Sequence, residues 1–224
     1  MGRENKNEAI ASGHRARILQ AAEALFMEKS FPATTIADIS AASGYSRRTL
    51  YAYYESKEEI LRQIVKQGLE QLRQELQSAV EGSDGFERRS RAVFDVMLRY
   101  HRESPCSAQV VSSTPARQLM PPGESGLPNS AKEILALGEG ITKYLMDFLK
   151  AGQAQGFFRL SIRPELTVPL WDNQAAGLAQ LLQTKGAYYA KLGVSERELT
   201  DYAYEQFMLS LRRIKEPERG LHEL

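Results

Sequence analysis

Apolar residues recur at helical spacing along almost the whole chain of 224 residues, and no stretch alternates convincingly as a half-buried strand would. The first periodic stretch is RARILQAAEALFMEK, in which Ile18, Leu19, Ala22, Leu25 and Phe26 fall on one face of a helix. Longer stretches of the same kind fill the chain beyond residue 56. The pattern predicts an all-α protein.

Two short helices are predicted directly after the first one, in the segment TTIADISAASGYSRRTLYAYYE. Thr35 and Asp38 have the spacing of a capping box. Gly44 can adopt the positive φ of a tight turn, and Ser46 is placed to cap a second short helix that Leu50 anchors. Together with the first helix, these elements predict a compact three-helix head, from about residue 12 to residue 56, that contains a helix-turn-helix.

Further helices are predicted beyond the head. Their expected bounds are 56–80, 86–103, 129–155 and 164–192, followed by one last helix. Capping boxes open two of them, Ser56 with Glu59 and Ser195 with Glu198. The apolar residues of the last helix are Leu199, Tyr202, Phe207, Leu211 and Ile214.

The segment 105–129 breaks this pattern, because prolines and glycines punctuate it. They are Pro105, Pro115, Pro121, Pro122, Gly123, Gly126 and Pro128. A short helix over 107–113 is predicted, and a loop is expected after it. A long loop in a compact domain is either functional or disordered. The sequence leaves both interpretations open, a pocket rim or a surface excursion.

Two runs in the head, ILQAAEALF and ATTIADISAASGYSRRTLYAYYESKEEIL, closely resemble the DNA-binding head of TetR-type transcriptional regulators. The positions that fit the family's pattern are Thr35, Asp38, Ile39, Gly44, Ser46, Thr49, Leu50, Tyr51, Tyr53, Ser56, Lys57 and Glu58. Three positions depart from it. Ser30 stands where the family usually has glycine, Tyr45 replaces a small aliphatic residue, and Arg48 replaces a frequent glycine.

The resemblance implies that the second short helix enters the major groove of DNA. The residues expected at the interface are Thr35, Tyr45, Ser46, Arg47, Arg48, Thr49, Tyr51, Tyr53 and Lys57. Arg47 and Arg48 have the reach to read base edges, whereas Tyr51, Tyr53 and Lys57 are expected at phosphates. The alternative is a solvated helix face with tyrosines that are half-buried by packing.

Composition adds a few bounds to this hypothesis. The net charge is +1, so affinity for DNA has to come from where cations cluster and not from their total. Positive groups also lie near the N-terminus, diluted by Glu4 and Glu8: Arg3, Lys6, His14, Arg15 and Arg17. Residues 1–13 are expected to be a flexible tail, and the alternative is an arm toward phosphate. The single cysteine, the polar N-terminus and the lack of a long apolar run favour a cytoplasmic protein without a membrane anchor.

Catalytic and metal chemistry find little support in the sequence. His14, His101 and His222 lack the spacing of metal ligands, so no metal site is expected. His101 and Cys106 lie close in sequence, yet no strand-turn-helix elbow accompanies them. The glycines around residue 139 lack the lysine of a phosphate loop. We therefore expect neither enzyme activity nor a cofactor.

The resemblance further implies an effector site and a dimer interface in the rest of the chain. The candidate effector residues are Phe94, Met97, Leu98, His101, Tyr144, Phe148, Trp171, Gln174 and Leu178, although for each residue taken alone core packing is the favoured interpretation. They favour a largely hydrophobic small molecule. The last two helices are expected to pair with those of a second copy.

The resulting hypothesis divides the chain into a tail (1–13), a helix-turn-helix domain (14–58) and an effector-binding and dimerisation domain (59–224). It describes a homodimeric repressor that a small effector releases from a palindromic operator on double-stranded DNA. The alternative is an architectural DNA-binding protein that responds to no effector. A helical enzyme is a third hypothesis, which no motif supports.

Overall fold

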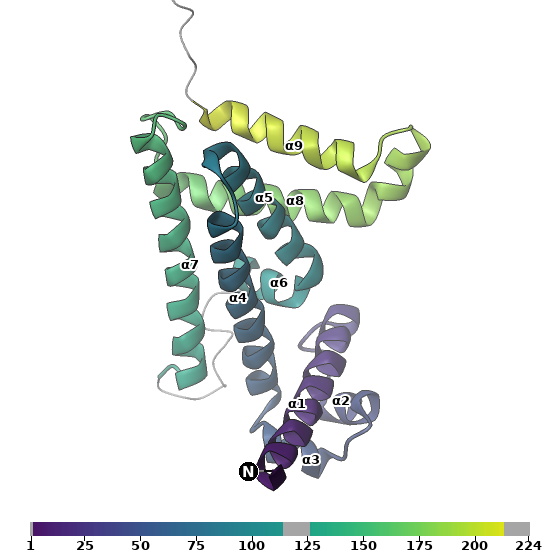
Figure 1. Cartoon of the computed structure of the whole chain (residues 1–224). Coiled ribbons are helices and arrows are strands. Elements are labelled where there is room, and N and C mark those ends of the chain that lie inside the picture. The colour runs from purple at the N-terminus through teal and green to yellow at the C-terminus, as the bar shows by residue number, and fades with distance from the viewer. Residues whose placement is uncertain (1, 114–125, 213–224) are drawn as a thin grey trace, which may run out of the picture. The chain divides into compact units, whose positions relative to one another are not determined.

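The computed structural model describes residues 2–113 and 126–212, and within these residues the chain is all-α, as predicted (Figure 1). The helices are α1 (Gly2–Lys29), α2 (Ile36–Ser43), α3 (Arg47–Tyr53), α4 (Lys57–Glu81), α5 (Gly85–Glu103), α6 (Pro105–Ser113), α7 (Asn129–Ala154), α8 (Pro164–Lys191) and α9 (Glu196–Leu211). The one extended pairing in the described part is an isolated bridge between Phe158 and Arg212. No described helix combines the length and apolar composition needed to cross a membrane.

The helices form two compact units. The first contains residues 1–74 and 103–139, and the second contains 75–102 and 140–224. The boundary that the sequence suggested, between residues 58 and 59, falls inside the first unit. The reason is that α4 runs on without a break and α6 packs against its first half, where the hydroxyl of Ser107 donates to the carbonyl of Val65.

The head of the first unit has the expected small apolar core. Ile18, Ala22 and Phe26 of α1 are buried with Ile39 of α2 and Leu50 of α3. α1 packs along α2, and α2 contacts α3 through the turn at residue 44. The three-helix head was therefore predicted correctly, although its first helix is longer than expected.

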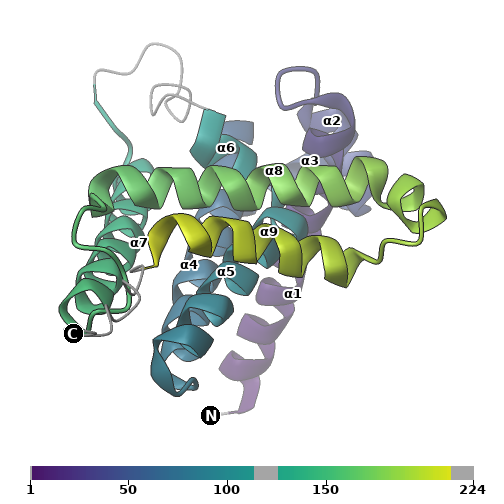
Figure 2. The ribbon, with the colours of Figure 1, turned by 90° about the horizontal axis from the view of Figure 1, so that it is seen from above.

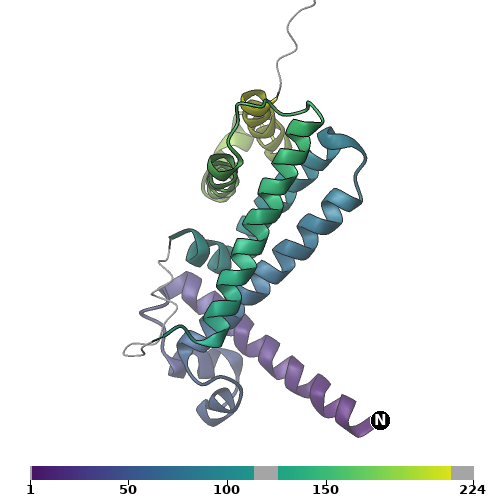
Figure 3. The same ribbon diagram turned by 90° about the vertical axis from the view of Figure 1, so that its left-hand side faces the viewer.

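Residues 2–13, which were expected to form a flexible tail, are helical in the structure. α1 begins at Gly2 and runs unbroken to Lys29, so its first turns extend past α2 and α3 (Figure 3). No proline interrupts residues 2–13, and the run ENKNEAIA contains several good helix formers, which allows the helix to continue outward from the packed turns.

The predicted helix ends are confirmed in most places. The capping boxes of Thr35 with Asp38 and of Ser195 with Glu198 are complete. Gly44 has φ 75°. In the box predicted at Ser56, the serine hydroxyl accepts from the N–H of Glu59, but the Glu59 carboxylate bonds Arg62, Gln63 and Ser130 instead of the backbone of the cap.

The punctuated segment is described in part. α6 confirms the predicted short helix, and its Ser107 fits closely against α4, since a Cβ on Gly68 would lie 2.5 Å from the Ser107 hydroxyl oxygen. Residues 114–125, on which the two interpretations of the loop depend, lie outside the described residues, as do residues 213–224.

The second unit is organised by the hairpin of α8 and α9, which lie side by side along most of their length (Figure 2). Aromatic rings fill its core: Phe148 lies 6.3 Å from Trp171 between ring centroids, and Trp171 lies 5.7 Å from Phe207. Phe158 packs so closely on α7 that a Cβ on Gly152 would come within 2.2 Å of its ring.

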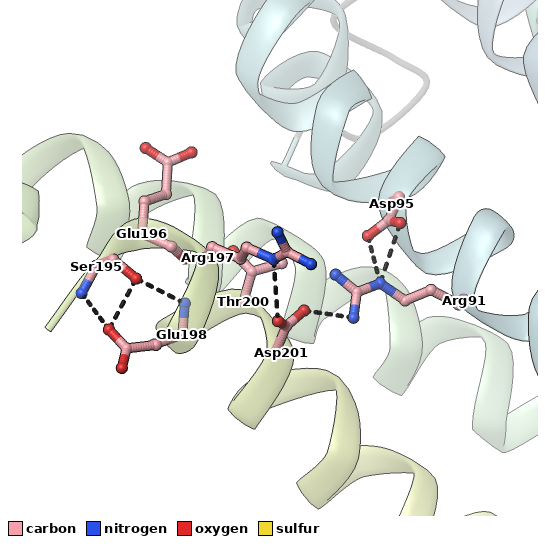
Figure 4. A network of polar contacts seen from close by, with 8 residues as sticks. All are labelled: Arg91, Asp95, Ser195, Glu196, Arg197, Glu198, Thr200 and Asp201. Carbon is pink, nitrogen blue, oxygen red and sulfur yellow. Dashed lines mark hydrogen bonds and ion pairs between the residues drawn. The ribbon is translucent and has the colours of Figure 1, made fainter.

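Ion pairs tie α5 to the start of α9 in this unit (Figure 4). Nε of Arg91 lies 2.9 Å from Oδ1 of Asp95, and its Nη1 lies 2.6 Å from Oδ1 of Asp201. The same guanidinium lies over the ring of Tyr204, 5.1 Å from its centroid. The charges of α5 that face α9 are thereby neutralised within the protein.

Candidate DNA-binding surface and effector residues

The second helix of the helix-turn-helix, α3, presents two arginines to solvent. Leu50 is 1% exposed and anchors the helix to the head, while Arg47 and Arg48 lie on its exposed side. No carboxylate of the described residues forms an ion pair with either guanidinium. The arrangement leaves ten N–H donors, five per guanidinium, available to an acceptor outside the protein.

The cap residues predicted at the interface are engaged with their own helices. Ser46 accepts from the N–H of Thr49 at 3.1 Å, and the two hydroxyls lie 2.9 Å apart. Thr35 accepts from the N–H of Asp38, and its own N–H and hydroxyl donate to the Asp38 carboxylate. These hydrogen bonds lower the pKa of Asp38, the backbone bond from Thr35 being the largest cause.

Lys57, predicted at a phosphate, donates at 2.8 Å to the carbonyl of Phe31 and at 2.8 Å to that of Thr34. Its ammonium also lies 4.4 Å from the centroid of the Phe31 ring. Two of the three ammonium donors therefore hold the turn between α1 and α2. The phosphate contact stays a prediction, with one donor left for it.

Two of the three tyrosines predicted at the interface contact α1, which sequence reasoning did not foresee. Tyr51 is 55% exposed and projects from α3. Tyr45 and Tyr53 are half-buried, and both lie beside the imidazole of His14. The arginines on either side of Ala16 lie over these two rings. Arg15 and Arg17 fall within the first predicted helix, but the sequence does not show which residues of the helix-turn-helix their side chains contact.

The candidate effector residues lie in the second unit, and most are buried. The buried ones are Phe94, Met97, Leu98, Phe148, Trp171 and Leu178. Phe148 and Trp171 are brought together, whereas Phe94 packs on Tyr204, 5.4 Å between centroids. Of the two tyrosines on α9, the structure exposes Tyr202 and buries Tyr204.

The polar candidates differ in how fully they are satisfied. Nε2 of His101 lies 2.9 Å from Oδ1 of Asp172, and the hydroxyl of Tyr144 donates to the carbonyl of Leu76. Gln174 donates its amide to the carbonyl of Ala203 at 3.0 Å. The buried Nε1 of Trp171 and Oε1 of Gln174 have no hydrogen-bond partner among the residues that the structure describes. Unpaired buried polar atoms are rare and call for an explanation.

Cys106 does not have the surroundings of a nucleophile. It is buried on α6, and burial, with a smaller effect of Glu23, raises the pKa of its thiol to about 12. A thiol with this pKa holds little thiolate at neutral pH. The pairing of His101 with Asp172 also leaves the histidine engaged elsewhere.

The sequence of the head is similar to that of known transcriptional regulators. Residues 18–64 match the family model of the bacterial regulatory proteins, tetR family. The uncharacterized HTH-type transcriptional regulator YfiR of Bacillus subtilis (strain 168) is 39% identical over 67 residues, which are 30% of this chain and 33% of YfiR. The HTH-type transcriptional repressor KstR2 of Rhodococcus jostii (strain RHA1) is 38% identical over 61 residues, 27% of this chain and 30% of KstR2.

The fold as a whole is also similar to solved structures. AibR, solved in complex with isovaleryl coenzyme A and operator DNA, superposes with a TM-score of 0.67 over 86% of this chain and 97% of that chain, at 14% identity. At this identity the likeness shows the fold. The sequence matches span about a third of the length of the curated relatives.

The fold and the head define a helical protein with an N-terminal helix-turn-helix. Over residues 18–64 the head matches the tetR family of bacterial regulatory proteins.

Proposed function

We propose that the protein is a DNA-binding transcriptional regulator of the TetR type, and that it acts as a dimeric repressor. The observation that carries the proposal is the exposed, unpaired Arg47 and Arg48 on a short helix that Leu50 and Ser46 fix in the head. Arginine forms bidentate hydrogen bonds with guanine, and each such contact contributes about 1–3 kcal/mol of discrimination. The relative KstR2, a repressor, supports the direction of regulation.

The dimer is proposed to form through α8 and α9. Both helices leave large apolar side chains in solvent, and the most exposed are Leu166, Leu170, Tyr188, Leu192, Tyr202 and Leu209. On α8, a Cβ on Gly177 or Gly186 would meet nothing within 4 Å. The surface of the helix at these glycines is therefore open to a partner helix. Two heads held by such an interface would read half-sites about one helical turn, 34–36 Å, apart.

The effector is proposed to be a small, largely hydrophobic molecule that binds in the second unit. Support comes from the apolar candidates around Trp171, and from AibR, which was solved with isovaleryl coenzyme A. The unpaired N–H of Trp171 and the unpaired amide oxygen of Gln174 would bind a ligand group that accepts and donates hydrogen bonds. Such a ligand shifts the protein off DNA only if it binds the two conformations with different affinity.

Footprinting upstream of the protein's own gene tests the DNA-binding proposal, and a palindromic protected site is expected. Arg48→Ala should weaken binding by about ten- to a hundredfold and relax the preference at one position of each half-site. Arg73→Ala is the matched control, because Arg73 is exposed on α4, about 24 Å along that helix from its start. An Arg48→Ala variant with unchanged affinity and preference would refute the assignment of the recognition helix.

The single tryptophan provides the test of the effector proposal. Isovaleryl coenzyme A is a first probe, followed by apolar acids and ketones, with the fluorescence of Trp171 and the release of the operator fragment recorded together. A ligand that changes both supports the effector-released repressor. If ligands leave both unchanged over the whole set, the effector-independent architectural protein is the better description.

A further inference from the structure

The middle of α1 meets α3 and the turn before it in a cluster of basic and aromatic side chains. Nδ1 of His14 lies 3.0 Å from the hydroxyl of Tyr53, and its ring lies 4.8 Å from that of Tyr45 between centroids. The guanidinium carbon of Arg15 lies 5.4 Å from the centroid of Tyr53, and that of Arg17 lies 5.8 Å from the centroid of Tyr45. Two cations are thus seated on two rings with an imidazole between them.

The arginines of this cluster form no ion pairs among the described residues. Arg15 and Arg17 are exposed, and neither forms an ion pair with a carboxylate of the described residues. A stack on an aromatic ring occupies the face of a guanidinium and leaves its in-plane N–H groups free. These N–H groups are the donors that bind phosphate in a bidentate manner.

The cluster lies next to the N-terminus of α3, the helix that is expected to enter the major groove. Tyr45 directly precedes Ser46, the N-cap of α3, and a Cβ on Gly44 would lie 3.4 Å from Nη2 of Arg17. The major groove is about 12 Å wide. A cation within about 6 Å of the residues that begin a groove-bound helix is therefore within reach of the phosphates that line the groove.

We infer that α1 carries a second DNA contact, in which Arg15 and Arg17 bind backbone phosphates beside each half-site while Tyr45 and Tyr53 hold them in place. The inference rests on the proposed operator binding and adds residues to it. The aromatic ring at position 45, where the family usually has a small aliphatic residue, then acts as a positioning residue for Arg17. His14 bonds Tyr53 and stacks on Tyr45, which fixes both rings.

Salt dependence of binding tests the inference directly. Each phosphate contact contributes about 0.9 to the slope of log K against log salt concentration. Arg15→Gln with Arg17→Gln should lower the slope by about 1.8 for each head, or about 3.6 for a dimer. The loss should be equal on the footprinted operator and on a mixed-sequence duplex, because phosphate contacts carry no sequence information.

Three controls separate the outcomes. Arg15→Lys with Arg17→Lys keeps the charges and should restore most of the slope, whereas Arg73→Gln should leave the wild-type slope. In a background of Arg17→Gln, Tyr45→Leu should cost no further affinity, while alone it should weaken binding several-fold. Circular dichroism of each variant checks that the head stays folded.

An unchanged slope in the double glutamine variant would overturn the inference, and so would a Tyr45→Leu effect that persists without Arg17. Failure of the proposed function looks different. In that case the wild-type protein itself shows no salt-sensitive retention of either duplex.

Discussion

The two units use arginine in opposite ways. In the second unit, arginines face carboxylates: Arg91 binds Asp95 and Asp201, Arg102 binds Glu196, and Arg212 binds Glu87. On the head, the arginines at 15, 17, 47 and 48 form no ion pair with any described carboxylate. The net charge of +1 conceals this difference, because it is a total over the whole chain and does not show where the charges lie. Unneutralised cations gathered on one small surface suit a polyanion such as DNA.

Most of the large apolar side chains that are exposed on the described residues lie in the second unit. Leu170 and Leu209 of the second unit are 64% and 66% exposed, and Leu166, Tyr188 and Tyr202 of the same two helices are exposed as well. Large exposed apolar patches mark interfaces with proteins. The comparison is consistent with the proposal that the head binds DNA and that the second unit carries the dimer interface.

The largest effect is expected from charging the apolar hairpin. Leu166→Asp with Leu170→Asp places two carboxylates on one face of α8, and each should cost about 2 kcal/mol of dimerisation, about thirtyfold in the dimer Kd. Sedimentation velocity should show a monomer at micromolar concentration, and operator affinity should fall with it. Leu160→Asp is the control, since Leu160 is exposed but lies outside both helices. A double variant that remains dimeric would place the interface elsewhere.

A buried arginine of the first unit sharpens the comparison, because it forms an ion pair within the protein, unlike the exposed arginines of the head. Arg62 is 4% exposed, and its Nη2 lies 2.8 Å from Oε2 of Glu59. Burial favours a higher pKa for Glu59, but hydrogen bonds from Gln63, Ser130 and Arg62 together outweigh it and lower the pKa. Glu59→Gln should therefore destabilise the protein at pH 7 by about 2 kcal/mol.

The sign of the pH dependence follows from that lowered pKa. The stability that the Glu59 carboxylate contributes is complete above its unfolded pKa of about 4.5 and is lost as the pH falls through the folded pKa. Urea unfolding should show the gap between wild type and Glu59→Gln closing as the pH falls below about 4.5. Glu133→Gln, which breaks an exposed pair with Lys66, should change stability by less than about 0.5 kcal/mol at any pH. A gap that stays constant on acidification would contradict the assignment.

Features set by a few neighbouring residues were predictable from the sequence. The capping boxes at Thr35 and Ser195, the turn at Gly44 and the bounds of most helices depend on local chemistry, and the structure has them. The resemblance of the head to one family also gave the fold class. Local rules suffice for such elements because each is decided within one or two turns of helix.

Features decided by contacts distant in sequence were not predictable. The carbonyls that bind Lys57 lie 23 and 26 residues away, and the ring of Tyr45 meets His14 across the head. On α9, Tyr202 and Tyr204 are equally aromatic, and only the packing of Phe94 decides which one is buried. A domain boundary inside the unbroken helix α4 leaves no mark in the hydrophobic pattern.

A smaller effect is expected from removing one helix cap in each unit, and the two variants distinguish the role of the head from that of the second unit. Thr35→Ala and Ser195→Ala remove the same hydroxyl from equivalent capping boxes, one in the head and one in the second unit, and each should lower stability by about 1 kcal/mol. Thr35→Ala should also weaken operator binding, because α2 supports α3. Ser195→Ala should bind like wild type once the dimer is saturated. Equal losses of DNA affinity in the two variants would mean that the caps do not report on separate units.

The smallest effect is expected at Ser30, which follows α1 and has a positive φ although it is not a glycine. Left-handed residues end or precede helices at Gly85, Gly156 and Gly193 of the second unit, whereas the head uses Ser30, with φ 73°, after α1. A left-handed conformation costs a residue with a Cβ about 1–2 kcal/mol, and glycine loses about 0.5–1 kcal/mol more backbone entropy on folding.

Ser30→Gly should therefore stabilise the head by a net of about 0.5–1 kcal/mol. Thr34 should still hold the turn in this variant, because its hydroxyl donates to the backbone carbonyl of residue 30, which glycine retains. Thermal unfolding should show a slightly higher midpoint with unchanged operator affinity. A lower midpoint would mean that the serine side chain contributes a contact worth more than the strain of its backbone.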